Sequence, residues 1–177
     1  MFTYSYRLVD GLSVMHVKHS LIVVMCFLLL SGCGFKLRGA YKLPVEMQVT
    51  YIDAVQKNST LTRALVRTLK ASDIKVAENA ADDIAVLKLS NESKTKRIVS
   101  VDASGRAREY TLTYAIDFHV TALTAKFEIE KQTISIDRDF QFDTEDVLGN
   151  SREESQLYEE MQQDLIRLIL LRLQSKA

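Results

Sequence analysis

The chain is short of the residues on which many enzymes and metal sites depend. Its 177 residues include no tryptophan, one proline, two cysteines and three histidines, and His119 is the one histidine beyond residue 33. So few cysteines and histidines leave little from which to build a transition-metal site or a nucleophile paired with a base. Gly105 has no neighbouring glycines, which excludes a phosphate-binding loop of the Walker or dinucleotide type around it. This scarcity counts against a hydrolase and against a transition-metal enzyme.

Charge is balanced, and long apolar runs are missing from most of the chain. Lysine and arginine together number 23, as do aspartate and glutamate. A balanced protein has no overall field that favours nucleic acid, so any anion binding must be local. After residue 33 no apolar run reaches the roughly 18 residues that a transmembrane helix needs. We therefore expect a folded domain with no membrane-spanning helix and no nucleic-acid partner.

The amino-terminal segment has the features of a secretory signal. An unbroken apolar stretch covers residues 21–30, with His16, Lys18 and His19 before it and small residues after it. A basic end, an apolar core and a small-residue cut site follow each other as in a signal peptide, and this core is too short to span a bilayer. We therefore predict a signal peptide over residues 1–32, with Met15 as an alternative start.

The end of this signal matches the lipobox of bacterial lipoproteins. The run Leu-Ser-Gly-Cys that ends at Cys33 predicts cleavage before Cys33, diacylglycerol on its sulfur and an acyl chain on the new amino end. Several acyl chains anchor a protein stably, because each buried methylene contributes about 0.8 kcal/mol. An aspartate after the cysteine commonly marks retention at the inner membrane, whereas this chain has Gly34. By resemblance, the destination is the outer membrane.

The remainder is predicted to form a lipidated tether over residues 33–44 and a single domain over residues 45–177. Apolar side chains alternate over residues 45–51, as in a half-buried strand. They then recur at helical spacing over residues 61–69, after Ser59 or Thr60 as a cap.

Three further strands are predicted next. Extended runs over residues 84–101 and 109–121 flank residues 102–105, which end in glycine and predict an antiparallel hairpin. In the run over residues 127–142, the apolar side chains fall at odd-numbered positions up to residue 129 and at even-numbered positions from residue 134. This shift by one residue predicts a bulge between them.

A second helix ends the domain. Ser151 and Glu154 have the spacing of a capping box and predict a helix of roughly 20 residues. The order strand, helix, three strands, helix predicts an α+β two-layer sandwich, with a four-stranded, mostly antiparallel sheet packed against two helices.

Basic residues are dense around the predicted hairpin. Lys94, Lys96 and Arg97 precede the turn, and Arg106 and Arg108 follow it. Antiparallel pairing brings Arg106 and Arg108 to the end of the hairpin, with Lys96 and Arg97 further along it. Two interpretations stand equally: a site for anions, or a solvated strand end whose charges deter edge pairing.

With these elements in order, the chain resembles the LptE family of LPS-assembly lipoproteins of Gram-negative bacteria. The similarity lies in short motifs spread along the chain in the family's order: the opening Cys33-Gly34-Phe35-Lys36-Leu37-Arg38-Gly39, the helix segment Leu61-Thr62-Arg63-Ala64-Leu65, the segment Gly105-Arg106-Ala107-Arg108-Glu109-Tyr110 after the turn, and Glu160-Met161 in the last helix.

The resemblance implies a non-enzymatic protein without a cofactor that sits as a plug in the outer-membrane β-barrel LptD and assists the insertion of lipopolysaccharide into the outer leaflet. It also implies lipopolysaccharide contacts by a basic residue just before the hairpin glycine and by another before the last helix. This chain has Ala103 and Asn150 at about those places, so the candidates nearby are Arg97, Arg106, Arg108 and Arg152.

An alternative from another class is a periplasm-facing scaffold or binding lipoprotein of a different envelope assembly machine. The Cys-Gly-aromatic opening and the hairpin motif that ends in Glu109-Tyr110 favour the LptE resemblance.

Overall fold

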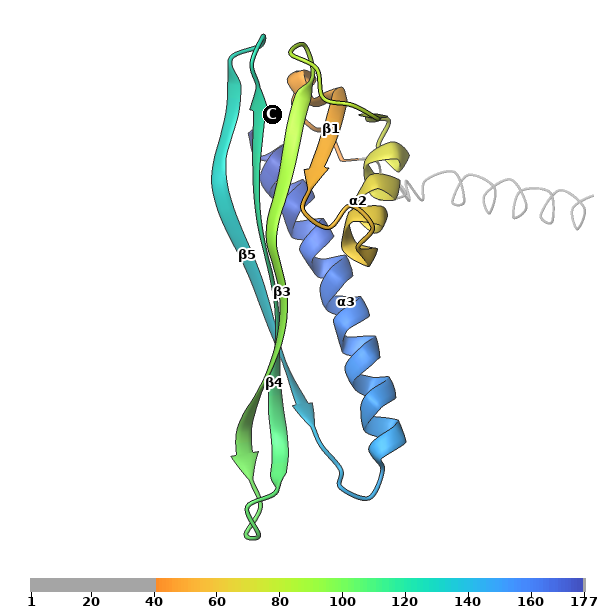
Figure 1. The fold of residues 1–177 in the computed structure, drawn as a ribbon, viewed down its shortest axis with the longest axis vertical. Helices are drawn as coiled ribbons and strands as arrows, with labels where there is room; N and C mark the ends of the chain where they lie inside the picture. Colours follow the sequence, from red (N-terminus) through yellow and green to blue (C-terminus); the bar gives the residue numbers. More distant parts are fainter. Residues whose placement is uncertain (1–40, 177) are drawn as a thin grey trace, which may run out of the picture. The chain divides into compact units, whose positions relative to one another are not determined.

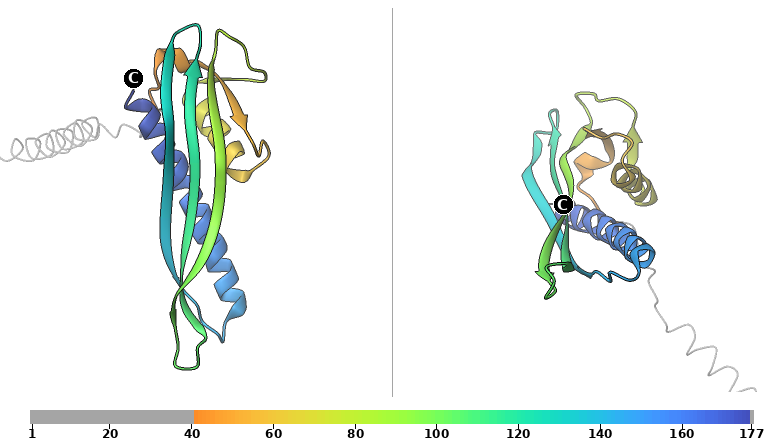
Figure 2. Two further views of the ribbon diagram at one scale, coloured as in Figure 1. Left: turned by 60° about the vertical axis from the view of Figure 1, so that its left-hand side comes forward. Right: turned by 60° about the horizontal axis from the view of Figure 1, so that its bottom comes forward.

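The computed structural model describes residues 41–176, so the predicted signal peptide, Cys33 and most of the predicted tether lie outside the described residues. Figure 1 shows the elements, which are the 3-10 helix η1 (Val45–Met47), β1 (Val49–Ala54), α2 (Thr60–Ala71), β2 (Lys75–Ala77), β3 (Ala85–Val101), β4 (Ala107–Ala122), β5 (Phe127–Gln141) and α3 (Val147–Gln174). Both long helices lie on the same face of the sheet (Figure 2). The predicted two-layer α+β architecture is confirmed.

The sheet has five strands in the order β2-β1-β3-β4-β5, one more than the four predicted. Strand β1 pairs in parallel with both β2 and β3, whereas β3, β4 and β5 form an antiparallel meander. The prediction missed β2 because its three residues are too few to display an alternating pattern. The strand forms because α2 returns the chain to the side of β1.

The first strand begins later than predicted. Residues 45–47 form a 3-10 helix, and the buried residues of β1 are Thr50, Ile52 and Ala54. Thr50 tolerates burial because its hydroxyl donates a hydrogen bond to the Met47 carbonyl, 2.7 Å away. The alternation over residues 45–51 predicted that the odd-numbered side chains face the core, whereas the even-numbered ones do so in β1. A shift by one residue reverses which side of a strand is buried, so the predicted inward face is wrong for β1.

Side-chain caps set the beginnings of the two long helices. Ser59 accepts a hydrogen bond from the Thr62 N–H at 3.0 Å, which confirms the predicted start of α2. The capping box predicted for the last helix is wrong, because α3 begins one turn earlier and has 28 residues. Its cap is Asp146, whose carboxylate accepts a hydrogen bond from the Gly149 N–H at 2.8 Å.

One face of the sheet forms the hydrophobic core with the two helices. Strand β4 confirms the predicted alternation, with buried side chains at Leu112, Tyr114, Ile116, Phe118 and Val120. The helices contribute Leu61, Leu65 and Leu69 from α2, and Met161, Leu165, Ile166, Ile169, Leu170 and Leu173 from α3. Within residues 41–176, neither helix combines the length and the apolar character that crossing a bilayer requires.

One β-bulge in β3 and one in β5 lie on either side of β4 near Asp117, and the Asp117 carboxylate contacts residues of both bulged strands. The β3 register shifts between Ser90 and Ser93. The β5 register shifts between residues 129 and 132, which confirms the predicted bulge. The Asp117 carboxylate accepts hydrogen bonds from Lys131 Nζ (2.8 Å), Thr133 Oγ1 (2.6 Å) and Asn91 Nδ2 (2.7 Å). These donors, Lys131 first, lower the pKa of Asp117 to about 2.

The bulge in β3 changes which of its side chains face the helices. Asn91 adopts a positive φ of 53°, a conformation that asparagine tolerates better than most residues. Beyond it, Lys94 and Lys96 lie directly opposite the inward-facing Tyr114 and Leu112. The bulge therefore places Lys94 and Lys96 on the side of the sheet that faces the helices.

Candidate functional site

Asp102 organises the tip of the β3–β4 hairpin. Its carbonyl accepts a hydrogen bond from the Gly105 N–H (2.9 Å), and its own N–H donates to the Arg106 carbonyl (2.8 Å). Its carboxylate accepts hydrogen bonds from the N–H groups of Ser104 (2.7 Å) and Arg106 (3.0 Å). Gly105 has a φ of 80°, which glycine adopts without steric cost. The predicted turn over residues 102–105 is confirmed.

Arg106 shares its charge with the same aspartate. Its Nε donates a hydrogen bond to Asp102 Oδ2 at 2.9 Å, while the side chain remains 63% exposed. The backbone N–H of Arg106 is the main cause that lowers the pKa of Asp102, and the guanidinium adds to it against the opposing effect of desolvation. The turn therefore supplies a fixed carboxylate next to one of the predicted cations.

Lys96 and Arg97 are neighbours in sequence but lie on opposite faces of the sheet. Lys96 lies on the helix side, with its Nζ 2.6 Å from Glu154 Oε2 of α3. The same ammonium group lies 4.2 Å from the ring centroid of Tyr110 and 5.2 Å from that of Phe140. It therefore ties α3 to the hairpin stem through an ion pair and cation–π contacts. Arg97 pairs with Thr111 on the uncovered face.

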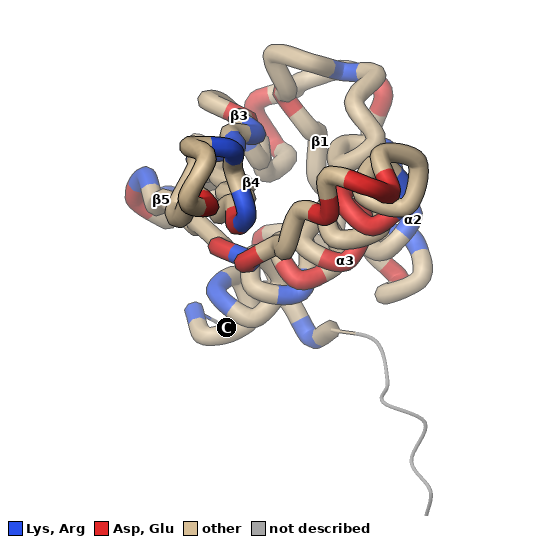
Figure 3. The backbone as a smooth tube through the Cα atoms, turned by 90° about the horizontal axis from the view of Figure 1, so that it is seen from below, with Lys and Arg blue, Asp and Glu red and all other residues tan. Residues whose placement is uncertain are grey.

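Arg108 borders a groove that is mainly acidic. The groove has a volume of about 930 Å³ and lies between the hairpin stem and the loop from β5 to α3. Arg108 is the one basic residue among the described residues that line it, and the carboxylates around it are Asp102, Glu109, Asp143, Asp146 and Glu153. Viewed from this end (Figure 3), red acidic segments surround the start of α3. The groove is thus poorly suited to an anion.

Arg152 lies apart from the other predicted cations. It borders a shallow hollow on α3 with Leu148 and Ser155, and not the groove beside Arg108. The structure therefore does not bring the four predicted arginines into one cluster.

Asn150, at about the place where the resemblance implies a basic residue, has a structural role. Its side chain is buried, accepting from the Asp143 N–H (3.0 Å) and donating to the Asp143 carbonyl (2.5 Å). A basic side chain at this position would not form the same pair of bonds.

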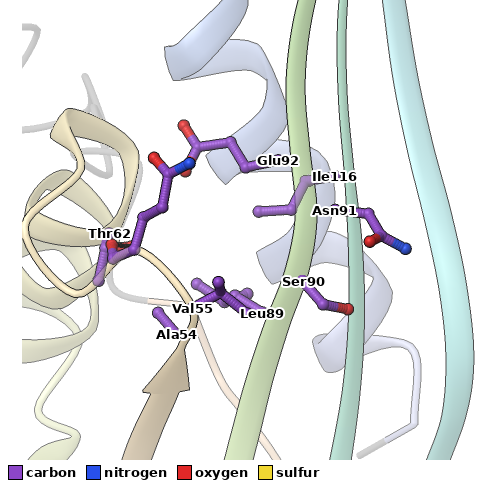
Figure 4. A pocket seen from close by; sticks show the side chains of 9 residues that line it. Ala54, Val55, Thr62, Leu89, Ser90, Asn91, Glu92 and Ile116 are labelled. Atoms are coloured by element: carbon purple, nitrogen blue, oxygen red, sulfur yellow. Dashed lines mark hydrogen bonds between the residues drawn. The ribbon is translucent and has the colours of Figure 1, made fainter.

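A smaller hollow of about 200 Å³ lies at the β3 bulge, beside the end of β1 (Figure 4). Glu92 points towards α2 there, whereas Asn91 points to the other side of β3. Glu92 accepts a hydrogen bond from the Tyr114 hydroxyl at 2.6 Å. Burial, followed by this carboxylate, raises the pKa of Tyr114. Among residues 41–176, no three His, Cys, Asp or Glu side chains group as a metal site requires.

A second basic region, which was not predicted from the sequence, lies between α2 and α3. Arg63, Arg67 and Lys94 line one hollow of about 480 Å³ there, together with polar residues of both helices. The spacing of Arg63 and Arg67, one helical turn apart and away from the buried leucines, was visible in the sequence. The proximity of Lys94 was not, because it depends on the β3 bulge.

Comparison with known proteins identifies a family for the whole domain. The profile of the LptE family, described as Lipopolysaccharide-assembly, matches residues 47–173. The LPS-assembly lipoprotein LptE of Pectobacterium atrosepticum is 28% identical over 160 residues, which cover 88% of this chain and 86% of that relative.

Solved structures agree with this assignment. The crystal structure of the rare lipoprotein B from Shewanella oneidensis has a TM-score of 0.64 and 30% identity, covering 72% of this chain and 94% of that one. The solution structure of a lipoprotein B from Nitrosomonas europaea has a TM-score of 0.63 and 31% identity, covering 77% and 88%. The family and its relatives are named for assembly and not for an enzymatic reaction, in agreement with the prediction of a non-enzymatic protein without a cofactor. This chain therefore belongs to the LptE family of lipopolysaccharide-assembly lipoproteins.

Proposed function

We propose that this chain is a lipid-anchored component of the outer membrane that assembles as a plug with the β-barrel protein LptD and assists the insertion of lipopolysaccharide into the outer leaflet. The family match over residues 47–173 is the observation that carries the proposal. In this proposal residues 1–32 are the signal peptide, Cys33 bears the lipid, and residues 45–177 form the single domain that enters the barrel.

The uncovered face of the sheet supports a polar protein partner. Thr111 and Thr113 of β4 donate hydrogen bonds to Asp139 (2.9 Å) and Asp137 (2.6 Å) of β5. Contact with hydrocarbon chains would remove water from these carboxylates, at a high cost in free energy. The interior of a large membrane barrel is polar and contains water, so this face is compatible with a position inside one.

Affinity purification from detergent-solubilised membranes tests the proposal. The tagged full-length chain is expected to recover a large β-barrel protein in a constant ratio, identified by mass spectrometry as LptD. A tagged outer-membrane lipoprotein of another family serves as the control for nonspecific recovery. Recovery of the chain alone, or with the components of a different envelope machine, would favour the alternative of a scaffold or binding lipoprotein.

Within this function, the hairpin end is the proposed contact for the anionic part of lipopolysaccharide. Arg97 on the uncovered face and Arg106 at the tip are the exposed cations of the hairpin, whereas Arg108 lies beside the acidic groove. Arginine forks bind phosphate groups with two hydrogen bonds, which suits them to this contact. Arg152, on α3, is a further candidate.

We expect Arg106→Glu/Arg108→Glu to weaken lipopolysaccharide binding by more than tenfold, or about 1.4 kcal/mol. The melting temperature should change little, because exposed charges contribute little to stability. The measurement is the binding of labelled lipopolysaccharide to the purified full-length protein at two salt concentrations, with weaker binding at the higher one.

The matched control is Lys57→Glu/Lys176→Glu, which makes the same change in net charge at two exposed positions outside the hairpin. Equal loss in both variants would show a general charge effect. Unchanged affinity in the hairpin variant would leave the hairpin as a solvated strand end.

A further inference from the structure

Three basic side chains that share one hollow lack carboxylate partners. Some cations within residues 41–176 form ion pairs between different elements, as Lys96 does with Glu154 and Arg138 with Asp164. By contrast, Arg63, Arg67 and Lys94 have no carboxylate oxygen within 4.0 Å among the described residues. They line the same hollow of about 480 Å³ between α2 and α3.

Helix α2 holds two of these charges in a fixed relation. Its buried side carries Leu61, Leu65 and Leu69, so the exposed Arg63 and Arg67 lie on the opposite side, one turn apart. Like charges at this spacing repel each other and destabilise a helix. An anion between the two guanidinium groups would remove this repulsion.

Lys94 is positioned by aromatic rings and not by a carboxylate. Its Nζ lies 4.6 Å from the ring centroid of Tyr114 and 5.1 Å from that of Tyr158. Tyr158 is itself fixed, because its hydroxyl donates a hydrogen bond to the Thr95 carbonyl at 3.1 Å. Cation–π contacts orient an ammonium group while leaving its full charge available to an anion. The hollow therefore contains a cation that is held in place before any ligand arrives.

The other groups that line the hollow are mostly uncharged polar side chains, which can donate or accept hydrogen bonds, and the Ser155 hydroxyl already donates to the Ser151 carbonyl. Thr60 and Ser155 contribute hydroxyl groups, and Gln162 and Gln163 contribute amides. Thr60 is also the first residue of α2, so the positive end of the helix dipole lies at the same place. Glu159 is the one carboxylate among the described lining residues. Three cations against one carboxylate leave two positive charges, which match the two negative charges of a phosphate monoester.

We propose that this hollow, defined by Arg63, Arg67 and Lys94, is a binding site for a terminal phosphate group, as in inorganic phosphate or a phosphate monoester. The two arginines grip the phosphate oxygens with paired N–H groups, and Lys94 supplies a third, less directional charge. The phosphate is either free in solution or attached to a lipid headgroup. The inference does not rest on the proposed function, and it concerns a surface other than the hairpin end.

Calorimetric titration of the full-length protein in a neutral detergent, at low salt and in phosphate-free buffer, tests the proposal. The three probes are inorganic phosphate, short-chain phosphatidic acid and short-chain phosphatidylcholine. Wild-type protein is expected to bind at least one of the first two and to bind phosphatidylcholine at least tenfold more weakly. Similar affinity for the first two identifies the free anion as sufficient, and at least tenfold tighter binding of phosphatidic acid identifies a lipid headgroup.

The variant Arg63→Glu/Arg67→Glu should bind the phosphate probes at least tenfold more weakly, and Lys94→Gln several-fold more weakly. A thermal melt verifies the fold, and Arg63→Gln/Arg67→Gln replaces the first variant if charge reversal prevents folding. The hairpin variant Arg106→Glu/Arg108→Glu should retain phosphate binding. The proposal is overturned if neither phosphate probe binds, if the α2 variant binds as well as the wild type, or if only the hairpin variant loses binding.

Discussion

Replacing Phe118 by aspartate is expected to leave the protein without a cooperative unfolding transition. Phe118 is fully buried in β4, which has a neighbouring strand on each side. Loss of the aromatic side chain costs about 3 kcal/mol or more, and an unpaired carboxylate at the same position adds several more. Together these costs approach the total stability of a small domain, about 5–15 kcal/mol. Circular dichroism during heating measures the effect, and Leu112→Asp and Ile116→Asp should behave alike.

The matched control is the next residue, His119→Asp. His119 lies on the opposite face of the same strand and pairs with Lys88 of β3. An aspartate there remains in contact with water beside a positive charge, so the melting transition should be retained. Should Phe118→Asp melt cooperatively near the wild-type temperature, the inward face assigned to β4 would be wrong.

The second large effect expected is the acid sensitivity that Asp117 confers. Its pKa is about 2 in the folded protein against an ordinary value of 3.8, and its side chain is 9% exposed. A lowered pKa stabilises the folded state at every pH above the ordinary value, by about 2 kcal/mol here. This contribution is lost as the pH falls from about 4 to about 2, because the folded state then also binds the proton.

Urea unfolding of the wild type and of Asp117→Asn at several pH values measures this contribution. The wild type should be more stable by about 2 kcal/mol at pH 7, and the difference should shrink towards zero near pH 2. Asp73→Asn, at an exposed position with positive φ, should retain the acid dependence of the wild type. A difference between wild type and Asp117→Asn that stays constant from pH 7 to pH 2 would contradict the role assigned to the carboxylate.

Much of the fold is predictable from the sequence because long elements repeat one pattern many times. The alternation along β4, the helical spacing in α2 and the parity change in β5 each identify the element correctly. Errors lie where few residues carry the signal or where two structures share one pattern. Strand β2 is too short to show a period, and the alternation over residues 45–51 continues through a 3-10 helix. The start of α3 was misplaced because Asp146 and Ser151 are both acceptable caps.

The site was harder to predict because basic side chains that are adjacent in sequence do not lie on the same surface of the protein. The bulge at Asn91 places Lys94 and Lys96 on the helix side and Arg97 on the uncovered side. Carboxylates distant in sequence then pair with some of the cations, as Glu154 does with Lys96. Neither the direction of a bulge nor a partner on another element follows from local spacing.

Helix α3 also determines when this protein can fold. It is the last described element, and its second half brings Met161, Leu165, Ile169 and Leu173 into the core with the sheet. Strand β1 likewise waits for β3, which follows α2 and β2 in the chain. Contacts between such distant segments form late and slowly. Stable folding of the sheet therefore depends on α3, because without this helix much of the apolar face of β4 and β5 would stay exposed to water.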